Sequence, residues 1–171
     1  MLFIYLSMLV GVCQAQTLIT IQLGDSPVYV QMDKDTWDDA VEKRLKSGAY
    51  VATFEKKMEK GHVATFSYKV EKVKAYTDIQ RFSTAQLMSF NHLEGFKILK
   101  SFTSSDGRFS LPYTVGYEAV YWDEHKIKHH LYLLHSIQET YGISIMLDFP
   151  DEYHRLYEEE QVAILHSIQL K

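Results

Sequence analysis

Apolar and polar residues alternate along much of this chain, with the period of two that is typical of β-strands buried on one face. The first such stretches are 17–23 and 28–32, and the turn residues 24–27 between them predict a hairpin. The same pattern predicts six further strands, at 50–57, 63–74, 96–102, 113–122, 126–138 and 143–149. Short turns join the last three, so we expect them to form a three-stranded meander.

Three segments instead place apolar residues at helical spacing. A short helix is predicted within 33–48, with Asp35 as its N-cap. A second is predicted over 77–95, where Thr77 begins a capping box. A third is predicted over 151–170, with acidic residues near its start. Abundant tyrosine, phenylalanine and β-branched residues favour sheet over an all-helical bundle.

The first fifteen residues form a separate segment, because they carry no charge and are almost entirely apolar. Such a segment is typical of a secretory signal peptide, and the small residues before Gln16 predict cleavage after Ala15. The predicted organisation is a signal peptide at 1–15 and a single domain at 16–171, located in the periplasm or secreted. Two alternatives stay open: a buried N-terminal strand or helix, and a lipid attached to Cys13.

Charge and motifs exclude several classes of function. Cys13 is the only cysteine, so the exported domain would have neither a disulfide nor thiol chemistry. A formal net charge of −4 without a basic stripe argues against nucleic-acid binding and against a polybasic membrane site. Membrane contact is therefore expected only if Cys13 is lipidated. No glycine-rich phosphate loop or serine nucleophile motif occurs, and no cofactor is expected.

Four of the eight histidines lie within 22 residues, at His125, His129, His130 and His135. Successive residues of a strand point to opposite faces and rise roughly 3.3 Å each. His129 and His135 would share a face but lie about 20 Å apart, while His130 would point to the other face. We interpret the group as the histidines of a hairpin and expect no bound metal. A metal-assisted hydrolase that uses His125 and His129 stays an alternative.

The same alternation divides the strand at 126–138 into two faces. The face expected to be buried holds Ile127, His129, Leu131, Leu133, His135 and Ile137. The face expected to point outward holds Lys126, Lys128, His130, Tyr132, Leu134 and Ser136.

The C-terminal half carries the clearest family features. Residues 113–170 contain a strand, a basic strand, a third strand and a final helix that ends in the pattern Ile-Leu-x-Ser-Ile, at 164–168. With the preceding elements, from about Thr17 to Lys171, this order resembles the PsbP-like superfamily, which includes photosystem II protein PsbP, the periplasmic protein DcrB and adaptor chaperones of type VI secretion. The resemblance implies an α+β fold in which helices cover an antiparallel sheet, as an α/β/α sandwich. It implies no catalytic residues, because the family is not known as an enzyme class.

These observations lead to the expectation of an exported, non-enzymatic protein-binding or accessory domain of the bacterial cell envelope. The candidate surface for a partner protein is mixed aromatic and basic, and consists of Lys126, Lys128, His130, Tyr132 and Lys69. An equal alternative is that these residues only keep a sheet face soluble. An immunity or adaptor protein for a secreted toxin is a second candidate function.

Overall fold

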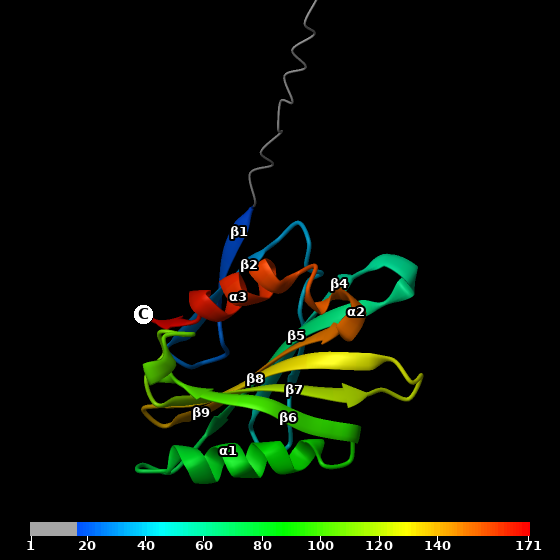
Figure 1. Ribbon diagram of the computed structural model, residues 1–171. Coiled ribbons are helices and arrows are strands. Elements are labelled where there is room, and N and C mark those ends of the chain that lie inside the picture. Colours follow the sequence, from blue (N-terminus) through cyan, green and yellow to red (C-terminus); the bar gives the residue numbers. More distant parts are fainter. Residues whose placement is uncertain (1–16) are drawn as a thin grey trace, which may run out of the picture.

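The computed structural model describes residues 17–171, in which a seven-stranded antiparallel sheet is the largest element (Figure 1). From one edge to the other, its strands are β3 (Val41–Arg44), β4 (Tyr50–Lys57), β5 (Val63–Lys72), β9 (Tyr141–Pro150), β8 (Lys128–Gln138), β7 (Thr114–Trp122) and β6 (Glu94–Thr103). The central strands β7, β8 and β9 follow one another in sequence and pair as neighbours. They are the predicted meander.

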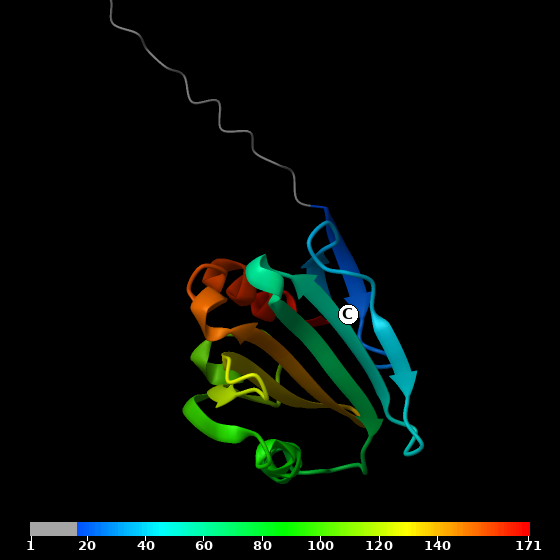
Figure 2. The same ribbon diagram turned by 90° about the vertical axis from the view of Figure 1, so that its right-hand side faces the viewer.

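A smaller sheet and the helices lie on the two faces of this main sheet. The small sheet consists of β1 (Leu18–Gln22), β2 (Val28–Asp33) and β10 (Gln169–Leu170). The helices are α1 (Ile79–Leu87), α2 (Asp151–His154) and α3 (Glu158–Ser167), with 3₁₀ turns η1 (Glu59–Gly61), η2 (Met88–Phe90) and η3 (Ser104–Asp106). Figure 2 shows α1 almost end-on beneath the main sheet, with α3 and the small sheet on the opposite side. The expected α+β fold, with helices on both faces of an antiparallel sheet, is confirmed.

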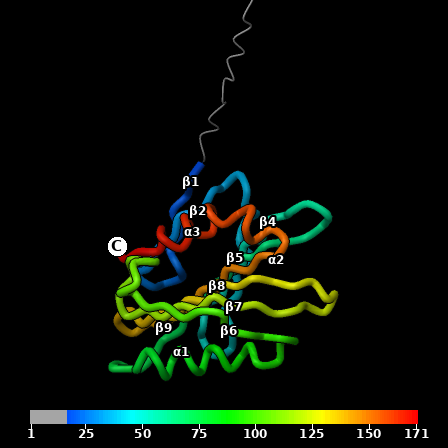
Figure 3. The backbone as a smooth tube through the Cα atoms, in the orientation of Figure 1, coloured from blue at the N-terminus to red at the C-terminus, as the bar shows by residue number. Residues whose placement is uncertain are grey.

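The face of the main sheet beneath α3 holds the larger core. Strands β5 and β9 contribute alternate residues to it, including Phe66 and Leu147, and these pack with Ile164 of α3 and Val30 of β2. The tube in Figure 3 shows how the chain leaves β9, passes through α2 and α3, and ends near β2. The final residues of the chain close this core, because β10 pairs with β2.

The strand β8 is buried on both faces, which corrects the expected outward face. Leu131 and Leu133 pack beneath α1 in a smaller cluster with Ala119. Tyr132 and Leu134 belong to the larger core on the opposite face. Alternation correctly predicts which residues share a face, but whether a second layer covers that face depends on where residues 151–171 return.

The predicted helix within 33–48 does not form. The chain instead turns after β2 and continues to β3, which pairs with the edge of β4. Trp37 is buried as a core anchor, edge-on to Phe149 with ring centroids 6.2 Å apart, and its Nε1 donates to Glu160 Oε1 at 2.9 Å. Short isolated helices are marginal in water, so pairing with a free sheet edge outweighs weak helical spacing.

The other two predicted helices form with changed boundaries. In α1 the N-cap is Asp78, whose side chain accepts from the Arg81 backbone N–H, whereas the Thr77 hydroxyl donates to the Lys74 carbonyl. The helix is also shorter than 77–95, because β6 begins at Glu94. The third predicted helix is divided into α2 and α3.

The structure leaves the predicted leader untested and adds one finding on membrane spans. The predicted leader at 1–15, with Cys13, lies outside the described residues, so its cleavage stays a prediction. Within residues 17–171, no helix is long and apolar enough to span a membrane.

Candidate functional site

A cavity of about 590 Å³ lies between the main sheet and the turn η2 that follows α1. Leu131 and Leu133 of β8 and Met146 of β9 line it from the sheet, and Phe90 and Leu93 line it from the segment after α1. The cavity extends over β5 to Val51 of β4, whereas α1 packs mainly on β7 and β8. A mostly apolar cavity with a few polar groups is the usual form of a binding site.

Three polar residues form a row across one end of this cavity. Lys69 on β5, Ser144 on β9 and His135 on β8 are direct partners in the strand register. Lys69 Nζ pairs with Glu71 Oε1 at 2.8 Å. The Ser144 hydroxyl is buried and has no hydrogen-bond partner among the described residues. Because buried polar groups are nearly always hydrogen-bonded, this hydroxyl is available to a bound group.

His135 connects the row to α1. Its Nδ1 lies 2.8 Å from Ser83 Oγ, and Ser83 Oγ lies 2.9 Å from the Tyr117 hydroxyl. Burial, with a smaller contribution from the positive charge of Lys69, lowers the pKa of His135 to about 4. The ring is therefore neutral at pH 7 and holds α1 in place by hydrogen bonds.

A second polar network closes the other end of the cavity. The Tyr121 hydroxyl donates to Asp148 Oδ2 at 2.8 Å, and His129 Nδ1 lies 2.7 Å from Asp148 Oδ1. Burial alone lowers the pKa of His129, but the hydrogen bond and charge of Asp148 outweigh this and raise it. Burial, with the nearby charge of Asp148, raises the pKa of Tyr121. Both Asp148 oxygens are engaged, so the network holds Asp148 and the Tyr121 ring in place at the cavity wall.

The structure does not bring the five predicted partner-surface residues together, which corrects that expectation. His130 and Tyr132 are only 5% and 6% exposed, beneath the layer that includes α2 and α3. Lys69 lies on the opposite face of the sheet, in the cavity. Lys126 is exposed and Lys128 is partly exposed, and they pair with Glu94 and Asp151, respectively.

Ser144 and Asp148 were not predicted as site residues, although the sequence contains a signal for them. Both interrupt the apolar run 143–149, and in a strand they fall on the same face. Polar residues at such positions in a buried strand indicate either hydrogen bonding or a site. Nothing in the sequence placed Ser83 next to His135, because that contact joins segments 52 residues apart.

Comparison with known proteins identifies the fold class. No family model matches the chain, and no curated protein sequence matches it. Among solved structures, it is similar to the cyanobacterial PsbP protein (CyanoP) from Synechocystis sp. PCC 6803, with a TM-score of 0.61 and 13% identity over 94% of this chain and 96% of that one. The similarity confirms the PsbP-like fold that the sequence resembles.

A second structure shares this architecture. It is PA94 from Pseudomonas aeruginosa, a protein of unknown function suggested to be a regulator, with a TM-score of 0.52 and 12% identity. The match covers 84% of this chain and 90% of PA94. At such identities, the two similarities establish the fold alone.

Proposed function

We propose that this protein is an exported, non-enzymatic accessory domain of the bacterial cell envelope, which binds an apolar segment of a partner protein in the cavity beside α1 and η2. The observation that carries the proposal is the cavity itself, with its apolar walls and the unpartnered Ser144 hydroxyl. The PsbP-like fold supports an accessory role, and the apolar leader supports export.

The chemistry of the cavity favours a peptide segment as its occupant. One or two large apolar side chains would bury against Leu133 and Met146, where transfer from water contributes about 25 cal/mol per Å² of apolar surface. The Ser144 hydroxyl would donate to a backbone carbonyl of the segment. Lys69, next to Ser144 in the register, would favour a carbonyl or a carboxylate at the same end.

The binding proposal predicts that the partner contacts the rim of the cavity and that filling the cavity weakens its binding. A photo-crosslinking residue at the exposed position Ser89, on the cavity rim, should capture the partner in intact cells. The same residue at exposed Lys46, outside the cavity, is the control.

With the purified partner, Ser67→Trp should weaken binding at least about tenfold, which corresponds to about 1.4 kcal/mol.

Glu55→Trp is the matched control for the cavity-filling variant. Glu55 lies on the neighbouring strand β4, is exposed and does not line the cavity. Equal affinity of the wild type and Ser67→Trp would overturn the proposal, and so would equal losses in the two tryptophan variants.

Export is tested separately by the mass of the mature protein. Cleavage after Ala15 should leave 171 − 15 = 156 residues that begin at Gln16. Intact mass and N-terminal sequencing of the protein from a periplasmic or culture fraction measure this. An uncleaved chain in the cytosol would contradict export without affecting the binding proposal.

A further inference from the structure

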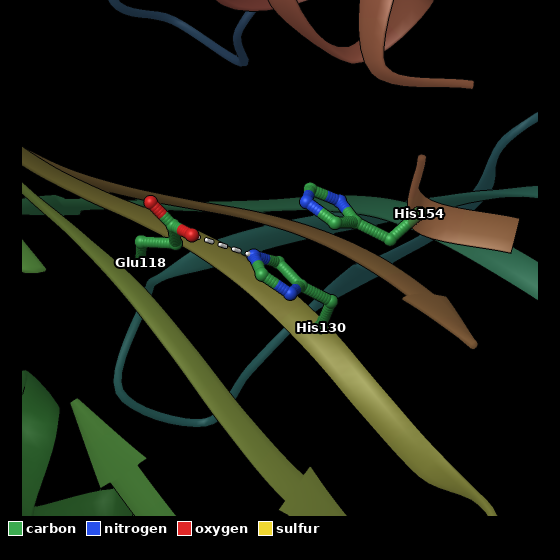
Figure 4. A group of neighbouring side chains, drawn as sticks. All are labelled: Glu118, His130 and His154. Carbon is green, nitrogen blue, oxygen red and sulfur yellow. Dashed lines mark ion pairs between the residues drawn. The ribbon is translucent and has the colours of Figure 1, made fainter. Parts of the chain in front are cut away.

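Three side chains that could ligate a metal converge on the face of the main sheet opposite the cavity. They are Glu118 of β7, His130 of β8 and His154 at the end of α2, and one ligand atom from each lies within 4.8 Å of the others. Figure 4 shows the outer ends of both imidazole rings turned toward Glu118. The side chains of Glu118 and His130 are 9% and 6% exposed, so the group lies within the fold.

The His130 ring presents a nitrogen that no described residue satisfies. Its Nε2 is buried and has no hydrogen-bond partner, although Glu118 Oε1 lies only 3.2 Å away. The carboxylate is therefore close, but outside the direction of a hydrogen bond. A buried ring nitrogen that makes no hydrogen bond to the buried carboxylate beside it lowers the stability of the fold. A cation bound by both groups would satisfy them and remove this cost.

The contact with Gln161 decides which ring nitrogen of His154 is left for a ligand. The Gln161 Nε2 donates to the His154 backbone carbonyl at 2.9 Å, so its Oε1 is the atom that faces His154 Nδ1 at 3.0 Å. Because a carbonyl oxygen can only accept, Nδ1 is the nitrogen that donates to Gln161, and Nε2 is the nitrogen left for a metal ion. Metal-ligating histidines almost always donate their other ring N–H to a fixed acceptor, and the buried Gln161 Oε1 can serve as that acceptor for His154.

The distance between the ligand atoms of His130 and Glu118 fits a small tetrahedral ion. The third ligand, His154, can join them after one local movement. Ligand bonds near 2.0–2.1 Å place tetrahedral ligand atoms roughly 3.3 Å apart, close to the 3.2 Å between His130 Nε2 and Glu118 Oε1. The rings of His130 and His154 are stacked, with centroids 3.5 Å apart and planes at 5°. Parallel rings cannot direct both lone pairs at one ion, so the less buried His154 must turn about its side-chain bonds.

We infer that Glu118, His130 and His154 bind one divalent transition-metal ion of the zinc type. Two imidazoles and a carboxylate suit zinc, whereas calcium and magnesium prefer oxygen ligands. A cavity of about 490 Å³, also lined by Asp151, leaves room for a fourth ligand. Lys100 pairs with the other Glu118 oxygen at 3.1 Å and leaves Oε1 free.

The inferred site differs from the expectation that the histidine-rich hairpin binds no metal, which stays a prediction. That expectation was argued from the spacing of the four histidines along the hairpin, at His125, His129, His130 and His135. The structure instead joins His130 to Glu118 on the adjacent strand and to His154 in a later helix.

Zinc titration of the purified full-length chain by calorimetry tests the inference. The wild type should bind one zinc ion, and both His154→Ala and Glu118→Gln should weaken binding at least about tenfold. Gln161→Leu, which removes the partner of His154 Nδ1, should weaken it by roughly 10–100-fold. His125→Ala is the control, since His125 belongs to the same hairpin but its side chain is 74% exposed and outside the cluster.

Circular dichroism of each variant checks that the fold is retained. If a variant unfolds, imidazole ¹⁵N chemical shifts of the wild type decide the matter, because zinc should move the Nε2 signals of His130 and His154 and leave that of His125 unchanged. The inference is overturned if zinc does not bind, if His125→Ala weakens binding as much as His154→Ala, or if the shifts move at other histidines.

Discussion

Replacing Leu133 or Leu134 with alanine is expected to lower the free energy of unfolding by about 2–5 kcal/mol in each case. Both side chains are 1% exposed, and they point to opposite faces of β8. Leu133 packs in the cluster beneath α1, and Leu134 packs in the larger core beneath α3. Each truncation removes buried apolar surface and leaves a cavity, so neither face of the strand should tolerate the loss.

Urea unfolding of the two variants measures this effect, with Leu156→Ala as the control. Leu156 is 72% exposed, so its truncation should change the free energy of unfolding by less than about 0.5 kcal/mol. If Leu134→Ala matches Leu156→Ala, the second layer does not cover that face of β8, and the outward face expected from alternation would be correct after all.

Acidification from pH 7 to pH 5 is expected to destabilise the protein, with about 2 kcal/mol of the loss coming from His135 alone. Burial, followed by the charge of Lys69, lowers the pKa of His135 to about 4 in the folded state. In the unfolded chain the pKa is about 6.5, so the unfolded state takes up a proton first as the pH falls. The contribution of the neutral ring to stability is therefore complete above pH 6.5 and is lost progressively between about pH 6.5 and 4.

The variant His135→Gln isolates this contribution, because glutamine is polar but does not titrate. The difference in unfolding free energy between pH 7 and pH 5 should be about 2 kcal/mol smaller in His135→Gln than in the wild type. His166→Gln, on the exposed side of α3, should keep the wild-type difference. A wild-type pH dependence in His135→Gln would show that the buried ring is not the group responsible.

Local patterns predicted the strands well because their causes are local. Alternation with a period of two and short polar turns predicted β4, β5, β7, β8 and β9 close to their observed positions. Such patterns depend on the pleat of a single strand, which needs no knowledge of distant residues. Reasoning from a local pattern failed at 33–48, where a few apolar residues at helical spacing predicted a short helix. Pairing of this segment with the free edge of β4 is more favourable than that helix.

The candidate sites were beyond the sequence because each depends on segments that meet only in the fold. The cavity needs η2 to lie over β5 and β9, and Ser144 becomes notable only when its hydroxyl is found without a partner. The ligand cluster needs α2 to return over β8, which places His154 against His130 across 24 residues of chain.

The sequence by itself determined the α+β class, the positions of most strands along the chain, and which residues of each of these strands share a face. Only the tertiary structure decided which of those faces are covered, and therefore that His130 and Tyr132 are buried and Lys69 lines a cavity. The physical reason is that the side-chain direction is set by the backbone of one strand, whereas burial is set by whatever second layer packs upon it. For this protein, that layer is formed by α1 on one face and by the returning C-terminal segment on the other.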